Sequence, residues 1–246
     1  MKHESPFILR TRSSLDTVPT PKTARGRETR AKLLAAAEAA FAEKDYHGTS
    51  IADMTQNAGI AMGTFYLHFP DKLAVFREVV RNLNQALRDQ LREAVAPART
   101  RLEVEQAGFE AFFRFVLQHR NLYRIVQQAE TVDAELYRWY YRRLAEGYVE
   151  ALENSMEKCE VKRLSAECLA YCLMGMGHFM GMRWPLWEGR QPPRAEMETL
   201  HELIRAGMFA DTGSGRPPGD RTKALRAKGS AAPKRPKDKK KRETSR

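Results

Sequence analysis

The sequence has little cysteine. Its 246 residues include only Cys159, Cys168 and Cys172, too few for the disulfide framework of a secreted protein. Cys168 and Cys172 stand four residues apart in an apolar stretch, and no further ligands with zinc-site spacing accompany them. We therefore expect small core side chains rather than a metal site, and a reducing compartment for the protein.

Long hydrophobic runs are also missing. The longest nearly apolar run, residues 169–182, is interrupted by His178 and is too short to span a bilayer. The opening residues MKHESPFILRTRSSLD lack the apolar core of a signal peptide. These features predict a cytoplasmic protein without a membrane anchor.

The middle of the chain lacks the excess of positive charge that the whole chain carries. The formal net charge is +11, but residues 25–210 hold 25 basic and 25 acidic side chains. Because residues 1–24 and 211–246 are rich in Ser, Pro, Gly and basic side chains, we expect a flexible arm and a disordered basic tail there. The tail would strengthen non-specific binding to nucleic acid by counterion release, so sequence reading must reside elsewhere.

Catalytic signatures are absent as well. The segment HELIR at 201–205 has Arg205 where the zinc-protease motif needs its second histidine. The segment GMGHFMG at 175–181 has its third glycine one place late for a dinucleotide loop, and no strand precedes it. We expect no enzymatic activity, no cofactor and no metal.

Apolar residues at helical spacing are what the sequence does have. They recur with a period near 3.6 along the chain, and no stretch alternates with the period of two that a strand requires. The fold class is therefore predicted to be all-α. The expected helices after residue 70 cover residues 72–95, 101–118, 121–129, 133–158, 165–184 and 194–209. Pro185 should end the fifth of these, and its three glycines suggest that another backbone packs closely against it.

Residues 50–69, SIADMTQNAGIAMGTFYLHF, predict two short helices joined by a sharp turn. Ser50 and Asp53 have the spacing of a capping box, and Gly59 suits the left-handed conformation that ends one helix before the next. Phe65 and Phe69 lie four apart on the inner face of the second helix, which leaves the intervening polar side chains outside.

This stretch resembles the helix-turn-helix of the tetracycline-repressor (TetR) family of bacterial regulators. The resemblance includes the preceding helix, RETRAKLLAAAEAAFAEKDYHGTSIADM, and the following segment, FPDKLAVFREVV. It implies a three-helix DNA-binding head at 25–70 and a helical ligand-binding and dimerisation body of about six helices at 71–210.

The resemblance also implies which residues meet double-stranded DNA. Met62, Gly63 and Thr64 are expected nearest the base edges. The residues expected on phosphates are Ser50, Tyr66, His68 and Lys72. Ala61 begins the recognition helix where the family often has serine or threonine, and Leu67 suggests methyl contacts to thymine.

Family bodies usually enclose a ligand cavity, so we expect a small, largely apolar effector. Residues expected to line the cavity are Phe109, Phe113, Tyr123, Trp139, Tyr140, Met176, His178, Met180 and Trp184. Each of them could instead be a core side chain, and His178 could be either a ligand anchor or a hydrogen-bonded core histidine.

The resemblance therefore implies a ligand-responsive transcriptional repressor that binds a pseudo-palindromic operator as a homodimer through its last two helices. An internal helix pair within a monomer is the alternative for those two helices. A DNA-organising or partner-binding helix-turn-helix protein without an inducer is the alternative function. A third possibility, a general nucleic-acid binder that acts through its tails, predicts little difference between operator and random DNA.

Overall fold

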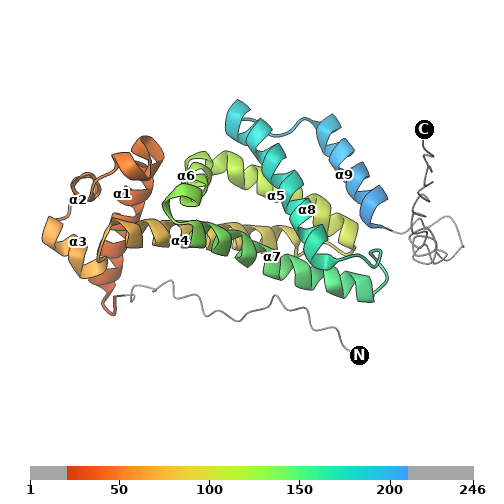
Figure 1. Ribbon diagram of the computed structural model, residues 1–246, viewed down its shortest axis with the longest axis horizontal. Helices are drawn as coiled ribbons and strands as arrows, with labels where there is room; N and C mark the ends of the chain where they lie inside the picture. Colours follow the sequence, from red (N-terminus) through yellow and green to blue (C-terminus); the bar gives the residue numbers. More distant parts are fainter. Residues whose placement is uncertain (1–20, 210–246) are drawn as a thin grey trace, which may run out of the picture. The chain divides into compact units, whose positions relative to one another are not determined.

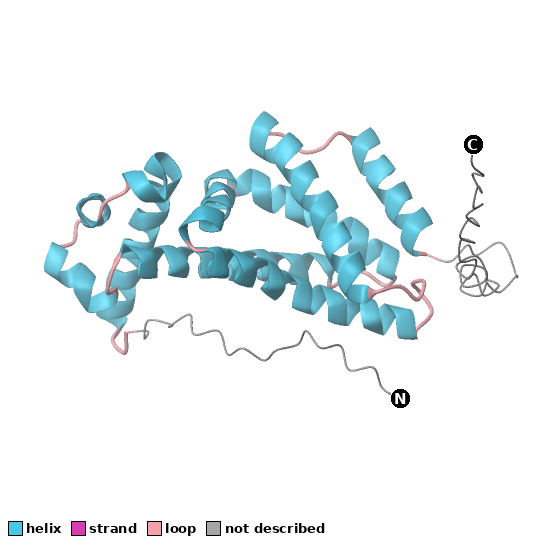
Figure 2. Ribbon diagram, viewed as in Figure 1, coloured by secondary structure: helices cyan, strands magenta, loops and turns pink. Residues whose placement is uncertain are grey.

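Helices make up the regular structure of this protein. The computed structural model describes residues 21–209, and within that range every regular element is helical (Figures 1 and 2). The α-helices are α1 (Ala24–Gly48), α2 (Ile51–Ala58), α3 (Met62–His68), α4 (Lys72–Val95), α5 (Arg101–Gln118), α6 (Arg120–Val132), α7 (Ala134–Glu157), α8 (Ala166–Gly181) and α9 (Arg194–Met208), with a π-helical segment η1 (Met182–Glu188) after α8. The predicted all-α class is confirmed, while the arm and tail predictions fall largely outside the described residues.

Local signals in the sequence set the helix ends in the head. The Ser50 hydroxyl accepts from the Asp53 backbone N–H at 3.1 Å, and the Asp53 carboxylate accepts from the Ser50 backbone N–H at 2.8 Å. This capping box satisfies two donors that the first turn of α2 leaves unpaired. Gly59, at φ 65°, ends α2 in the left-handed conformation that glycine adopts without steric cost.

One continuous core joins the three head helices to the helices that follow. Met54 of α2 and Phe65 of α3 are fully buried, and they belong to the same cluster as Phe76 of α4, Ile125 of α6 and Tyr140 of α7. A second cluster joins α5, α7, α8 and α9. The long helix α4 therefore packs against both the head and the body.

Two expectations about α8 are wrong in detail. Pro185 does not end the helical path, because the chain continues through the π-helical segment η1 to Gly189, which has φ 69°. The close neighbour of the glycines is an aromatic ring rather than a backbone: a Cβ added at Gly181 would lie 3.0 Å from the Phe112 ring of α5.

The cysteines do not lie in the core, contrary to expectation. Cys159, Cys168 and Cys172 are all exposed, and Cys168 and Cys172 lie on a face of α8 that no described helix covers. Among residues 21–209, no helix is long and apolar enough to cross a membrane. The same residues contain no group of three or more His, Cys, Asp or Glu side chains that could hold a metal ion.

Candidate functional site

Helix α3, which the sequence predicts to be the recognition helix, is held from its inner face. Phe65 and Phe69 are fully buried, and their rings lie 5.9 Å apart. The turn before α3 is fixed by the Ile60 backbone N–H, which donates to the Thr55 carbonyl at 2.9 Å. A helix of only seven residues is marginal by itself, so this anchoring determines where its outer face points.

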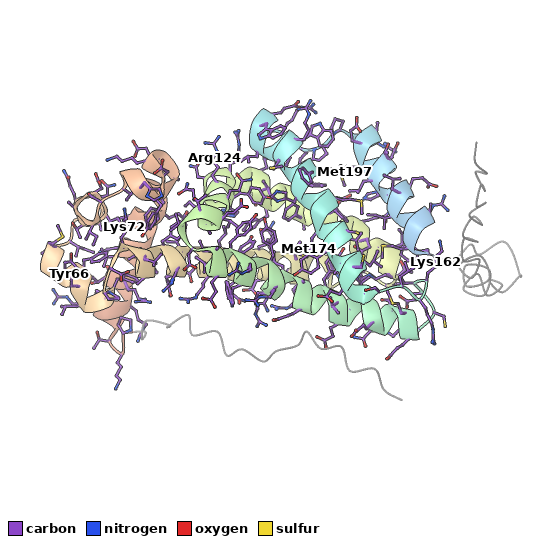
Figure 3. All side chains as sticks on the ribbon, viewed as in Figure 1. Tyr66, Lys72, Arg124, Lys162, Met174 and Met197 are labelled. Carbon is purple, nitrogen blue, oxygen red and sulfur yellow. The ribbon has the colours of Figure 1, made fainter. Side chains whose placement is uncertain are left out.

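The outer face of α3 presents large side chains to solvent. Met62, Tyr66 and Leu67 are 45%, 55% and 82% exposed. Gly63 is exposed, and a Cβ added there would meet nothing within 4 Å. Thr64 is half-buried. Figure 3 shows Tyr66 on α3, on the side of the head away from the body helices.

Two of the residues expected on DNA, Ser50 and Lys72, have intramolecular roles. The Ser50 hydroxyl is engaged with Asp53, as described above. The Lys72 ammonium donates to the carbonyls of Tyr46 and Thr49, both at 2.8 Å, and lies 4.4 Å from the centroid of the Tyr46 ring. Ala61 stands at the N-cap of α3 without a side-chain hydrogen bond. Lys72 thus holds the end of α1, and its phosphate contact stays a prediction.

His68 lies at the end of α3 and is half-buried. Burial, together with the nearby charge of Arg30, lowers the pKa of the His68 imidazole. Its Nδ1 atom is buried, and no hydrogen-bond partner for it is present among the described residues. The side chain is therefore biased toward the neutral form before any phosphate approaches.

Arg30 is a positioning residue of the head that we did not predict. From α1, its guanidinium donates to the His68 carbonyl at 3.1 Å and pairs with Glu78 of α4 at 3.2 Å. It also lies over the Phe69 ring, 4.4 Å from the centroid. Arg30 is only 5% exposed and precedes Leu33 and Ala37 at helical spacing, a pattern that could have placed it on the inner face of α1.

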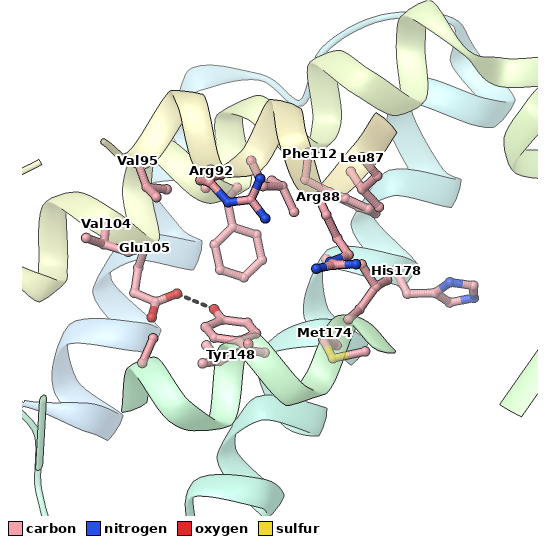
Figure 4. Close-up of a pocket in the computed structure, with 18 of the residues that line it drawn as sticks. Leu87, Arg88, Arg92, Val95, Val104, Glu105, Phe112, Tyr148, Met174 and His178 are labelled. Atoms are coloured by element: carbon pink, nitrogen blue, oxygen red, sulfur yellow. Dashed lines mark hydrogen bonds between the residues drawn. The ribbon is translucent and has the colours of Figure 1, made fainter. Parts of the chain in front are cut away.

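A cavity of about 330 Å³ lies among α4, α5, α7 and α8, with Tyr123 of α6 at one side (Figure 4). Four of the expected residues line it: Phe109, Tyr123, Tyr140 and His178. Further apolar lining residues that we did not predict are Leu87, Leu91, Val95, Val104, Phe112, Leu144, Leu173 and Met174. This volume lies within the range of small-molecule sites in proteins.

The other five expected residues lie elsewhere. Phe113 is buried in the core of α5, α7, α8 and α9, and Trp139 packs against the core shared with the head. Met176, Met180 and Trp184 line a shallow groove beside α9. On α8 the cavity is lined by Leu173, Met174, Gly177 and His178, whereas Met176 and Met180 lie on the side of the helix that faces the groove beside α9.

His178 is a hydrogen-bonded histidine in the cavity wall. Its Nδ1 atom lies 2.5 Å from the Tyr123 hydroxyl and 3.4 Å from the Tyr141 hydroxyl. Burial lowers the pKa of His178 and raises the pKa of Tyr123. A neutral imidazole that accepts from the Tyr123 hydroxyl fits both shifts, so this polar pair is satisfied within the protein.

Charged side chains also line the cavity, and we did not predict them. Arg101 Nε donates to Glu105 Oε1 at 2.7 Å, and the Tyr148 hydroxyl donates to Glu105 Oε2 (Figure 4). Burial and the Glu105 charge raise the pKa of Tyr148, which keeps the hydroxyl protonated as a donor. Three further arginines, Arg88, Arg92 and Arg143, complete the charged lining. In the sequence, each of these arginines has the pattern of a solvent-exposed position on a helix.

Polar contacts connect the body to the head beside α4. Gln128 of α6 accepts from the Tyr46 backbone N–H at 2.9 Å and donates to the Phe41 carbonyl at 3.4 Å. Arg77 of α4 pairs with Asp133, the N-cap of α7, at 2.7 Å. A shift of α6 or α7 would therefore act directly on the end of α1 and on α4.

An uncovered apolar surface spans α8, η1 and α9. Phe179 and Leu203 are 68% and 62% exposed and line the groove together with Met176 and Met180, and Trp187 of η1 is 65% exposed. Large apolar side chains gathered in this way mark interaction surfaces more often than isolated ones do.

The head matches a known family. Residues 33–79 match the family model described as bacterial regulatory proteins, tetR family. The HTH-type transcriptional activator FasR of Mycolicibacterium smegmatis is 28% identical over 105 residues, which cover 43% of this chain and 48% of FasR. The HTH-type transcriptional repressor KstR2 of Mycobacterium tuberculosis is 32% identical over 101 residues, or 41% of this chain and 50% of KstR2. The chain thus spans about half the length of these curated relatives.

Solved structures share the fold over most of the chain. Salmonella enterica GusR superposes with a TM-score of 0.66 at 20% identity, covering 76% of this chain and 98% of GusR. The fatty acid degradation regulator FadR of Bacillus halodurans gives a TM-score of 0.63 at 21% identity, with 72% and 94% covered. The match to the tetR-family model covers residues 33–79, and the all-helical fold is shared with solved structures over most of the chain: the chain is therefore similar to the tetR family in the sequence of its head.

Proposed function

We propose that this protein is a sequence-specific DNA-binding transcriptional regulator, a ligand-responsive repressor that acts as a homodimer on a pseudo-palindromic operator. The observation that carries the proposal is the outer face of α3, where Met62, Tyr66 and Leu67 stand exposed on a helix anchored by two buried phenylalanines. A short, firmly held helix with a protruding face is suited to enter a major groove.

The contacts divide into base reading and positioning. Met62, Gly63 and Thr64 would lie nearest the base edges, and the protruding Leu67 would add contacts to thymine methyl groups. Tyr66 and His68 would donate to phosphates. Ser50 and Lys72 would contribute chiefly by fixing the second and first helices of the head, with the remaining donor capacity of Lys72 directed to the DNA backbone.

Dimerisation would use the apolar surface of α8, η1 and α9. Burying Phe179, Trp187 and Leu203 against a second copy removes large apolar side chains from water, the main favourable term in association. Two-fold symmetry then presents two α3 helices to two half-sites, about one helical turn apart.

Ligand response would pass through α4. Leu87 and Leu91 of α4 line the cavity. The same helix packs on the head, where its Glu78 pairs with Arg30 of α1. A ligand that binds better to one arrangement of α4 shifts the equilibrium between DNA-binding and released states. Repression relieved by such a ligand is the regulatory outcome that we propose.

Selection of bound fragments from a randomised duplex pool tests this function. The proposal expects a pseudo-palindromic consensus from the full-length chain, retained when residues 211–246 are removed. A featureless pool that loses enrichment with those residues would contradict it and favour general nucleic-acid binding. A palindrome with no cavity ligand able to release DNA would favour a DNA-organising protein.

A further inference from the structure

The cavity wall carries an excess of positive charge, which a purely apolar ligand would leave without a partner. Its charged lining consists of four arginines and one glutamate. The glutamate, Glu105, is 2% exposed and already engaged by Arg101 and Tyr148, so this group is neutral overall and internally satisfied. Arg88, Arg92 and Arg143 remain, and all three line the same cavity from α4 and α7.

These three guanidinium groups make only weak intramolecular interactions. Arg92 pairs with Asp89 at 2.6 Å and Arg143 with Glu146 at 2.5 Å, each a neighbour on its own helix with both side chains well exposed. Exposed pairs of this kind contribute little and rearrange easily. For Arg88, the described part of the chain offers no carboxylate within ion-pair distance, and its guanidinium donates to the side-chain oxygen Oε1 of Gln85 at 3.4 Å.

Arg88 is the innermost charge of the three. It is half-buried, whereas the Arg92 side chain is 65% exposed. Burial and then the charges of Arg143 and Arg92 lower the pKa of Arg88. Figure 4 shows Arg88 and Arg92 extending from α4 into the space bounded by Tyr148 and Met174. An anion in that space would offset the mutual repulsion of these arginines.

The rest of the described cavity wall contains no other charged side chain that a ligand would need to neutralise. Beyond the arginines, the wall consists mainly of aliphatic and aromatic groups, with Phe109, Phe112 and Leu173 among them. Four polar side chains of the wall are paired with one another: Tyr123 with His178, and Tyr148 with Glu105. The site is therefore divided into an apolar interior and a cationic side.

We propose that the cavity binds an amphipathic anion, a molecule with an apolar body and a terminal carboxylate or phosphate held by Arg88, Arg92 and Arg143. The apolar body lies against Phe109, Phe112 and Leu173. The inference rests on the proposed function in treating this cavity as the effector site. The volume of about 330 Å³ corresponds to roughly eleven water-sized groups, which suits an apolar chain of about ten carbons.

Calorimetric titration of the full-length protein with three probes of one chain length tests the proposal. Decanoate and decyl phosphate carry the two candidate head groups, and 1-decanol is the neutral match. We expect at least one anion to bind about 10-fold or more tightly than 1-decanol, as a charge-assisted hydrogen bond allows. The anion that binds more tightly, decanoate or decyl phosphate, identifies the head group. Equal affinity for all three, or binding of neither anion, would overturn the proposal.

Variants locate the head group. Arg88→Gln should weaken binding of the preferred anion about 10-fold while leaving 1-decanol unchanged. Arg88→Lys should retain most of the affinity, since it keeps a charge at the same place. Arg142→Gln is the matched control, because Arg142 is exposed on α7 beside Arg143 and does not line the cavity. An equal loss for anion and alcohol in Arg88→Gln, or no loss, would contradict the assignment.

The titration contains no DNA, so its failure is distinct from a failure of the proposed function. A chain that selects a palindrome but binds 1-decanol as well as decanoate would remain a regulator with a different class of ligand. A chain that binds decanoate through Arg88 but selects no sequence would retain the site and lose the proposed regulatory role.

Discussion

Tyr66 is exposed, and its hydroxyl makes no hydrogen bond to any described residue. The neighbouring Phe65 ring meets the Tyr66 ring edge-on, with the ring centroids 5.3 Å apart. That contact restricts the ring without covering the hydroxyl. The side chain is thus oriented before DNA arrives, which reduces the entropy lost on binding.

Tyr66→Phe keeps the ring and removes only the donor. We expect DNA affinity to fall by about 1.5–3 kcal/mol, the usual contribution of a hydrogen bond to a charged group, with stability unchanged because the residue is exposed. Fluorescence anisotropy on a selected operator at fixed salt measures the change. Unaltered affinity would remove Tyr66 from the phosphate contacts.

Arg30 illustrates a second role at the residue scale, the orientation of a helix that it does not belong to. Arg30→Met preserves an apolar stem but leaves Glu78 and the His68 carbonyl without this donor. We expect a loss of about 2 kcal/mol or more in the free energy of unfolding, since a lost partner exposes the desolvation cost of the other.

Lys32→Met is the matched control for Arg30→Met. Lys32 lies on the same helix in an exposed pair with Glu28 at 2.8 Å, and we expect a change below about 1 kcal/mol. Denaturant unfolding measures both variants. Equal effects would mean that the buried contacts of Arg30 have no special importance.

Among the elements, α3 begins without a side-chain cap, as α6 and α9 also do. Its N-cap is Ala61, whereas the N-caps Ser50 of α2, Asp71 of α4 and Thr100 of α5 all accept backbone hydrogen bonds. The helix keeps its place through buried Phe65 and Phe69 rather than through its own end.

Ala61→Ser should supply the missing acceptor for a first-turn backbone N–H of α3. We expect stabilisation of about 1 kcal/mol, while Ser50→Ala should destabilise by a similar amount because it removes half of a capping box. Thermal unfolding followed by circular dichroism compares the two. A destabilised Ala61→Ser protein would show that the start of α3 is constrained by something other than its cap.

The ends of the helices followed from the sequence more closely than the faces they bury. Ser50, Asp53 and Gly59 act within one or two turns, so their roles could be predicted, and the expected helix at 101–118 coincides with α5. The side of α8 that meets the cavity depends on how α8 crosses α5 and α9, which no local pattern encodes. For that reason Met176 and Met180 were placed in the cavity although they line the groove beside α9.

The same reasoning explains the charged residues that we missed. Arg88 and Arg143 stand 55 positions apart in the sequence and meet only because α4 and α7 pack together. In isolation each looks like an ordinary solvated position. The cysteines show the converse case: an apolar neighbourhood in the sequence predicted burial, but it belongs to a surface that no described helix covers.

For the whole molecule, the apolar surface of α8, η1 and α9 bears on assembly. Leu203→Glu places a charge in the middle of the proposed dimer contact, and we expect the dimer dissociation constant to rise about 30-fold or more, as for a central interface residue. Sedimentation velocity over a concentration series measures the shift. Glu198→Ala, an exposed substitution on the same helix, should leave it unchanged.

In the proposed function, the continuous core through α4 would couple the cavity to the head. The cavity, the head and the link made by Gln128 all meet at or beside this helix. Dimer formation and ligand binding would then act on DNA through the position of the two α3 helices, the part of the molecule where sequence is read.

The most direct test of that account is a repeat of the fragment selection with Leu67→Gln. Leu67 is the most exposed large apolar residue of the head, and glutamine replaces its methyl contacts with a group that favours adenine. The account predicts a consensus changed at one symmetry-related pair of positions, with the rest of the palindrome and the dimer retained. A consensus identical to that of the unchanged protein would contradict the claim that the outer face of α3 reads the operator.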